Sequence, residues 1–333
     1  MSEMSNITFL LPLWDRSYYT KTWLKHNILP ECNYYIADGG MGNENEDLFK
    51  NVSLANVTYV RYPKDITSHD FIKKMHHAAN QIKTKYVMVV DNDDFINFDG
   101  IIQCINLLEK DSRAVCAGGV MYGIRQSNST SEGFRYDLPL KATDNYTLHN
   151  LSRFKAIVQL FKNYRYLWYS IFRSEDHKKI WEDIKTCNIS NLFLVEILHT
   201  ELAFCYGKYA HVKSNHYIRL KNPITSCAAA LSLNDKPHTQ KIYNDNDYTN
   251  ELIHMSRYVA NKLNVALEEL LAETMFYYNM QNNKKSSAGV FKIYALLLRL
   301  HEIVLRKLHV SLSIRQCISY INTICRMRGA LRM

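Results

Sequence analysis

A group of acidic and amide side chains directly follows an apolar run. Residues 86–90 are apolar, and Asp91, Asn92, Asp93 and Asp94 come next. An apolar run of this length predicts a strand buried on both faces, as in a parallel sheet covered by helices. Ligands of such open sheets bind beyond the carboxyl ends of the strands. The acidic residues therefore lie where ligand binding and catalysis are expected.

The spacing of Asp91 and Asp93 suits a divalent metal. Carboxylates this close raise one another's pKa unless a cation or several hydrogen-bond donors compensate them. Mg²⁺ and Mn²⁺ prefer hard oxygen ligands, and one or two carboxylates plus substrate phosphates often hold them. We therefore predict Mn²⁺ or Mg²⁺ as the cofactor.

Three other interpretations compete for this segment. A calcium-binding EF-hand loop needs glycine at its sixth position, where this chain has Ile96. A phosphatase of the haloacid dehalogenase type also has Asp-x-Asp after a strand, but near the start of its domain. The third is an acidic turn that caps a helix beginning near Asp99, since Asp and Asn favour turns and helix N-termini.

Strand-like and helix-like stretches alternate before this segment. Strands are predicted at 7–11, 34–37 and 57–62, and helices at 18–26 and 71–83. The first strand is expected to stop at Pro12, and Asp38 follows the second. Such alternation implies right-handed crossovers and a mostly parallel sheet with flanking helices, hence a Rossmann-like α/β fold.

The second half continues with mixed elements. We expect a helix at 100–110, a strand at 114–122, a polar loop at 126–133, a strand at 167–172, a helix at 175–184, a helix at 192–206 and a last strand at 211–219. The helix at 192–206 carries Glu196 and Glu201 in or beside an apolar face. A carboxylate in such a setting is either a structural group or a tuned base.

Composition indicates a soluble globular protein. The 333 residues are 47% hydrophobic and 22% charged, and the eight cysteines form no C-x-x-C pair. The cysteines are expected to be reduced and buried. We find no signal-peptide pattern and no apolar run of the ~20 residues that a spanning helix needs. The expected location is the cytoplasm or the inner face of the membrane.

The net charge of +9 is unevenly distributed. Residues 291–333 contain eight Lys or Arg and one acidic residue, and apolar side chains recur there at helical spacing. Such a helix either lies on an anionic membrane surface or docks on the protein's own core or on a partner subunit of a homo-oligomer. We expect no nucleic-acid partner.

With these elements in order, residues 6–220 resemble the GT-A glycosyltransferases, most closely the family-2-like group that uses sugar nucleotides. Pro12 followed by Asp15 and Arg16 resembles the nucleotide-binding loop of that family. Asp38 matches the strand-end Asp that contacts the base, and Asp91-Asn92-Asp93 matches the metal-binding Asp-x-Asp motif.

The resemblance also implies a base and further ligands. Glu196 lies eleven residues before Gly207, in the register of the family's general base, and Glu201 is its rival. His216 and Arg219 stand where related enzymes place late metal or pyrophosphate ligands, with His211 as a weaker match. The chain departs from the family's Ala-Arg-Asn segment and from its Glu-Asp pair. Either Lys74 or His77 would then take over the phosphate or base contact, or the donor would differ.

These inferences combine into one prediction. Residues 1–225 form a GT-A domain and residues 226–333 a basic, amphipathic helical region. The enzyme would transfer a sugar from a nucleotide-sugar donor to a glycan or lipid-linked acceptor with inversion, in bacterial surface polysaccharide synthesis. The expected donor-binding residues are Pro12, Asp15, Arg16, Asp38, Lys74, His77, Asn92 and Arg219, and the expected metal ligands are Asp91, Asp93 and His216.

Two alternatives remain. A nucleotidyltransferase acting on a sugar phosphate would need a glycine-rich, basic phosphate loop after the first strand, which residues 12–15 do not supply. A non-catalytic protein would bind polysaccharide or a membrane through its basic C-terminal helices.

Overall fold

The computed structural model describes residues 3–50, 54–130, 133–162, 166–220 and 246–271, together with Ser319 and Thr323. Its strands are β1 (Ile7–Leu13), β2 (Asn33–Asp38), β3 (Val57–Arg61), β4 (Tyr86–Val89), β5 (Phe95–Ile96), β6 (Ala114–Thr130), β7 (Gly133–Thr143), β8 (Ile171–Arg173) and β9 (Lys208–Leu220). Its helices are α1 (Ser17–Asn27), α2 (Glu44–Lys50), α3 (Ser68–Gln81), α4 (Phe98–Lys110), α5 (Arg153–Lys162), α6 (Ser174–Cys187), α7 (Leu192–Tyr206) and α10 (Asn246–Leu263). Two short 3-10 helices are η1 (Glu3–Asn6) and η2 (Tyr146–Leu148).

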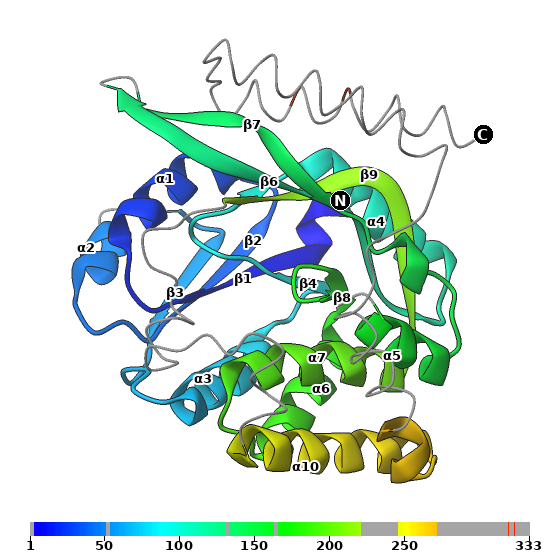
Figure 1. Cartoon of the computed structure of the whole chain (residues 1–333). Coiled ribbons are helices and arrows are strands. Elements are labelled where there is room, and N and C mark those ends of the chain that lie inside the picture. Colours follow the sequence, from blue (N-terminus) through cyan, green and yellow to red (C-terminus); the bar gives the residue numbers. More distant parts are fainter. Residues whose placement is uncertain are drawn as a thin grey trace.

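All these strands belong to one curled sheet (Figure 1), in the order β3-β2-β1-β4-β8-β6-β9-β5, with β7 paired to β6. The strands β3, β2, β1 and β4 are parallel neighbours. The predicted α/β class, with its mostly parallel sheet and flanking helices, is therefore confirmed. The carboxyl ends of these strands meet at one edge of the sheet.

The first strand continues past the point where the sequence predicts its end. β1 pairs with β2 as far as Leu13 opposite Asp38, whereas its pairing with β4 stops at Leu10 opposite Val89. Pro12 thus lies where only one side of the strand is paired. A proline is tolerated there because its missing N–H does not interrupt a ladder.

The second half of the sheet is mixed. β8 is antiparallel to β4 and β6, and β9 is parallel to β6. β5 pairs antiparallel with β9, with Phe95 opposite Ile218. This pairing returns the end of β9 to the acidic turn that follows β4.

The predicted polar loop at 126–133 is wrong. In its place, β6 and β7 form a long antiparallel hairpin, with Thr130 opposite Gly133. The hairpin projects beyond the rest of the sheet in Figure 1. Strand pairing between distant residues, such as Met121 with Thr143, decided this segment, and local composition does not reveal such pairing.

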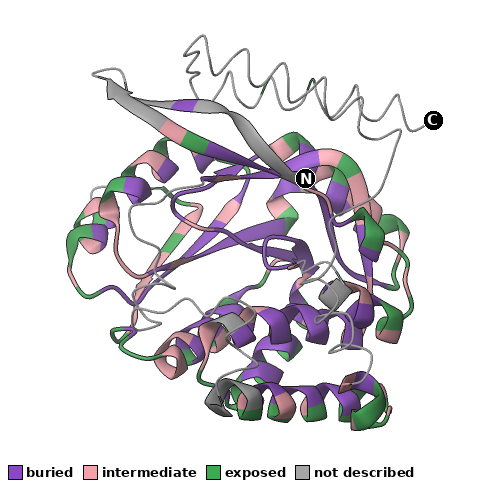
Figure 2. Cartoon of the chain, in the orientation of Figure 1, coloured by how far each residue is buried: buried purple, intermediate pink, exposed green. Residues whose placement is uncertain are grey.

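Helices cover both faces of the sheet. α3, α6 and α7 lie on one side and α1, α2 and α4 on the other, while α10 packs outside α6 and α7 (Figure 1). The central strands β1, β2, β4 and β8 are mostly buried, whereas β3 at the edge of the sheet is half-buried (Figure 2). The largest fully buried side chains include Trp23, Trp181, Tyr34 and Phe172. Five cysteines are buried and free, as predicted: Cys32, Cys104, Cys116, Cys187 and Cys205.

In the predicted C-terminal helical region, the structure describes α10 and a helical stretch at 267–271. The expected boundary near residue 225 and the basic segment 291–333 lie outside the described residues, apart from Ser319 and Thr323. Among the helices that the structure describes, none is both long and apolar enough to cross a membrane.

Candidate functional site

Three carboxylates form a compact group at the carboxyl edge of the sheet. One oxygen from each of Asp91, Asp93 and Asp94 lies within 4.8 Å of the others. Asp91 is half-buried, and Asp93 and Asp94 are buried. The turn that carries them is anchored by Asn27, which donates to the carbonyl of Asp94 over 3.0 Å and accepts from a backbone N–H after it.

Burial raises the pKa of Asp91, and the nearby charge of Asp93 raises it further. The same two causes raise the pKa of Asp94 well above its ordinary value. A cation in this group would relieve both effects, because it stabilises the ionised forms. Hard oxygen donors this close together fit Mg²⁺ or Mn²⁺, so the residues present suit the predicted metal.

Arg16 contacts two residues of the acidic turn. Its guanidinium donates to Asp93 Oδ2 over 2.9 Å and to Asn92 Oδ1 over 2.8 Å. Asn92 in turn donates to the carbonyls of Asp15 and Arg16 and to the hydroxyl of Thr20. Arg16 precedes α1 in a left-handed conformation with φ 68°, which is uncommon outside glycine, Asn and Asp. The loop after β1 and the turn after β4 are thus bound together.

A second arginine approaches from β9. The Arg219 Nε lies 3.8 Å from Asp94 Oδ2, and Asp94 Oδ1 accepts from the Leu220 N–H over 2.8 Å. The Arg219 guanidinium lies over the rings of Tyr166 and Tyr169, 5.3 and 4.8 Å from their centroids. The structure therefore places Arg219, a predicted donor-binding residue, beside the carboxylate group.

His216 does not fit the predicted role of metal ligand. Its Nδ1 accepts from the Gly119 N–H over 3.0 Å, and its Nε2 lies 3.0 Å from the carbonyl of Tyr169. Both ring nitrogens are thus engaged with the main chain. Burial lowers the pKa of His216 to about 4, so the ring is neutral near pH 7. Asp94, and not His216, is the third side chain of the group with Asp91 and Asp93.

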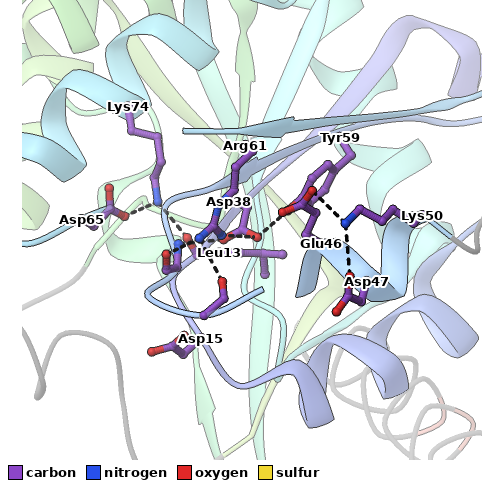
Figure 3. Close-up of polar contacts among 12 residues, drawn as sticks. Leu13, Asp15, Asp38, Glu46, Asp47, Lys50, Tyr59, Arg61, Asp65 and Lys74 are labelled. Atoms are coloured by element: carbon purple, nitrogen blue, oxygen red, sulfur yellow. Dashed lines mark hydrogen bonds and ion pairs between the residues drawn. The ribbon is translucent and has the colours of Figure 1, made fainter. Parts of the chain in front are cut away.

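Asp38 lies at the end of β2 in a network of its own (Figure 3). Its Oδ1 accepts from the Gly40 N–H over 2.7 Å, and its Oδ2 accepts from the Tyr59 hydroxyl over 2.6 Å and pairs with Arg61 at 2.9 Å. Gly40 is required there, because a Cβ would lie 2.1 Å from the carbonyl of Trp14. Asp38 is fully buried and ties the loop after β2 to β3, while Gly40 brings this loop close to the loop after β1.

Asp15 lies beside the same loop and is half-buried. Burial raises the pKa of its carboxyl, while hydrogen bonds from the N–H groups of Met41 and Gly42 oppose that rise. Pro12 is half-buried near the end of β1. Pro12 thus lies in the last part of β1 and Asp15 in the loop that follows it, both at the carboxyl edge of the sheet.

Lys74 is buried and belongs to an ion pair that the sequence does not predict. Its ammonium contacts Asp65 Oδ2 and donates to the carbonyl of Leu13 over 2.9 Å (Figure 3). A Cβ on Gly39 would lie 2.4 Å from the Asp65 carboxylate. The pair therefore joins α3 to the end of β1 and to the loop after β2. His77, one turn further along α3, is exposed and bonds to the Tyr62 hydroxyl at 2.7 Å.

The two candidate bases on α7 face different surroundings. Burial raises the pKa of Tyr166, and the negative charge of Glu196 raises it further. Half-buried Glu196 therefore lies on the side of the site that holds Tyr166 and Arg219. Glu201 is buried, and among the described residues its Oε2 has no hydrogen-bond partner. Its charge acts on Cys187 and Cys205, away from the carboxylate group.

His211 lies in β9 near a different cluster. Its Nε2 is 3.2 Å from Asp144 Oδ1, and its Nδ1 is 3.2 Å from the Tyr209 hydroxyl. These contacts give it no link to the acidic turn.

Sequence reasoning missed Tyr169 and Tyr217, which contact the acidic turn, and Asp65, which pairs with Lys74 beside the loop after β2. The Tyr169 hydroxyl donates to Asp91 Oδ2, and the Asp91 N–H donates to the Tyr217 hydroxyl over 2.8 Å. The aromatic-rich stretch around residue 169 was the available signal, but core packing explains such a stretch equally well.

Comparison of the sequence with protein-family models and with curated proteins found no match. The structure is similar to residues 1–349 of S. aureus TarS in complex with UDP-GlcNAc. The TM-score is 0.55, the identity 12%, and the match covers 82% of this chain and 72% of that one. A second structure of the same S. aureus TarS segment gives a TM-score of 0.53 at 11% identity, over 90% of this chain and 80% of that one. The chain therefore shares the fold of this S. aureus TarS segment.

Proposed function

We propose that the protein is a metal-dependent glycosyltransferase. It would move a sugar from a nucleotide-sugar donor to a hydroxyl group of a glycan or lipid-linked acceptor. The observation that carries this proposal is the group of Asp91, Asp93 and Asp94, flanked by Arg16 and Arg219 at the carboxyl edge of the sheet. A UDP-sugar is the first donor to test, because the similar S. aureus TarS structure holds UDP-GlcNAc.

The donor's diphosphate would lie at the carboxylate group. Asp91 and Asp93 would hold a divalent metal, which neutralises charge on the leaving diphosphate. Their described contacts use one oxygen of each carboxylate, so the other oxygen is left for the metal. Arg16 and Arg219 bring positive charge to the same edge, where phosphate oxygens would bind to their guanidinium groups.

The nucleoside would lie over the loops after β1 and β2. Asp15, Asp38 and the ion pair of Lys74 with Asp65 fix the main chain of these loops. Asp38 and Lys74 are buried and engaged, so we assign them the shaping of the loops. His77 is a weaker candidate for donor binding, because it bonds to Tyr62 on the exposed face of α3.

Glu196 is our choice of general base. It is half-buried on the side of α7 that faces Tyr166, whose hydroxyl bonds to Arg219. A carboxylate there would accept the proton of the acceptor hydroxyl as that oxygen attacks the anomeric carbon. One displacement inverts the anomeric configuration, and NMR of the product's anomeric proton distinguishes inversion from retention.

We place the reaction in the synthesis of a surface or cell-wall polysaccharide. The basic segment 291–333 would bring the enzyme to a lipid-linked acceptor at the inner face of a membrane, or would join two copies of the chain. The segment lies almost wholly outside the described residues, so this assignment rests on its sequence alone.

The test is a donor screen with a matched pair of variants. The full chain is mixed with UDP-, GDP- and CMP-sugars and acceptor glycans, with Mn²⁺ or with a chelator, and products are weighed by mass spectrometry. Asp93→Ala should abolish metal-dependent transfer and keep the fold. Asp99→Ala, which removes an exposed acid six residues away, should retain activity.

Other outcomes point elsewhere. Full transfer by Asp93→Ala would contradict the metal assignment. Formation of a nucleotide sugar from a sugar phosphate and a nucleoside triphosphate would identify a nucleotidyltransferase. If calorimetry finds no nucleotide binding with or without Mn²⁺, the result favours a non-catalytic protein that binds polysaccharide or a membrane.

A further inference from the structure

We propose that Tyr169 is a positioning residue for Asp91, and that His216 holds Tyr169 in place for this task. The inference rests on the proposed function, because it assumes that Asp91 is a metal ligand. The sequence predicts His216 as a metal ligand, whereas this role separates it from the metal by two residues, Tyr169 and Asp91.

Asp91 is held at both its side chain and its main chain by two tyrosines. The Tyr169 hydroxyl donates to Oδ2, and the Tyr217 hydroxyl accepts from the Asp91 N–H over 2.8 Å. The two rings stack with centroids 4.6 Å apart and planes 20° apart. Both tyrosines are buried, at 4% and 0% exposure. The position of Asp91 therefore depends on a rigid aromatic pair.

The main chain of Tyr169 is also fixed. It lies in a turn closed by the Ser170 N–H, which donates to the carbonyl of Leu167 over 2.9 Å. The Tyr169 carbonyl accepts from His216 Nε2 at 3.0 Å. Since His216 Nδ1 accepts from the Gly119 N–H, Nε2 must carry the proton of the neutral ring. One histidine thus ties β6 and β9 to the turn that precedes β8.

The chemistry explains why the hydroxyl is needed. A hydrogen bond donated to a carboxylate stabilises its ionised form, which a metal requires. The bond also engages one oxygen and leaves the other to face the metal. Groups that orient metal ligands in this way typically change metal affinity by roughly 10–100-fold when they are lost.

The experiment compares two single-hydroxyl deletions in the full chain. Mn²⁺ is titrated into wild type, Tyr169→Phe and Tyr86→Phe, and free Mn²⁺ is measured by electron paramagnetic resonance. We expect the dissociation constant to rise roughly 10–100-fold for Tyr169→Phe. Tyr86→Phe is the matched control, because this buried tyrosine donates its hydroxyl to Glu109, and the Mn²⁺ affinity of this variant should equal that of wild type.

A second variant keeps the test decisive if Tyr169→Phe does not fold, as judged by circular dichroism. His216→Phe leaves the Tyr169 hydroxyl in the protein and removes the bond to its carbonyl, so we expect a smaller loss of Mn²⁺ affinity. Wild-type affinity in whichever of these variants folds would overturn the inference and leave the proposed function standing. If wild type itself binds no Mn²⁺, the metal assignment fails, and the inference fails with it.

Discussion

Glu196 and Glu201 show how two similar residues acquire different chemistry. They lie five residues apart on α7, so their side chains point to different sides of the helix. Glu196 is half-buried near Tyr166, whereas Glu201 is 1% exposed beside Cys187 and Cys205. A substrate hydroxyl can reach a half-buried carboxylate more readily than one enclosed by the core.

These positions give a prediction about the base. Glu196→Gln should lower the transfer rate by roughly 10²–10⁴-fold, the usual contribution of a general base. Glu201→Gln should leave the rate within a few-fold of wild type, since its side chain faces the core. Initial rates with a saturating donor check both variants. A crippled Glu201→Gln beside an active Glu196→Gln would reverse the assignment.

At the level of elements, the end of β1 depends on a buried ion pair. Lys74 from α3 donates to the carbonyl of Leu13 and pairs with Asp65, and both charged side chains are almost fully buried. Burial raises the pKa of Asp65, and the charge of Lys74 opposes that rise. Loss of the ammonium would leave a buried carboxylate without its cation beside Gly39.

Lys74→Met should therefore lower the free energy of unfolding by about 3–5 kcal/mol. Lys73→Met, which changes the exposed neighbour on the same helix, should change stability by less than about 0.5 kcal/mol. Urea denaturation followed by circular dichroism measures both. Equal stability of the two variants would show that the pair contributes little.

For the whole molecule, the packing of α7 between the sheet and α10 makes stability depend on pH. Burial raises the pKa of Glu201 to about 8 from an ordinary 4.5. A carboxyl with a raised folded-state pKa binds its proton more tightly when folded. The contribution of the Glu201 carboxyl to the free energy of unfolding is therefore fully present below about pH 4.5. It is lost as the pH rises toward about 8.

Glu201→Gln removes this ionisation, so it should stabilise the protein relative to wild type by more at pH 8 than at pH 5. The gain should grow by up to about 1.4 kcal/mol per pH unit across that window. Denaturant titrations at pH 5, 6, 7 and 8 measure it, with Glu196→Gln as the control for a half-buried carboxylate. A stability difference that does not vary with pH would contradict the raised pKa.

α10 shows how the described C-terminal part joins the domain. Tyr258 and Lys262 both contact Asp183 on α6, at 2.9 and 2.7 Å, and the Glu251 carboxylate accepts from the N–H groups of Ser190 and Asn191. This helix is thus attached through polar contacts in addition to its apolar face. The expected boundary near residue 225 stays a prediction.

The sequence by itself determined the local features. Apolar runs followed by Asp38 and by Asp91-Asn92-Asp93 predict buried strands and an acidic strand end, because side-chain pattern sets burial. Parallel pairing of β1, β2 and β4 then follows from the alternation with helices. Arg16 follows the end of β1 in the chain, so it lies at the same edge of the sheet.

Only the tertiary structure decided the contacts between distant residues. The β6–β7 hairpin, the buried pair of Asp65 with Lys74, and the contact of Tyr169 with Asp91 join residues that no local pattern relates. His216 is the clearest case. A histidine on the last strand fits a metal ligand by type, but which partners its two nitrogens meet depends on how β6, β9 and the turn before β8 pack together.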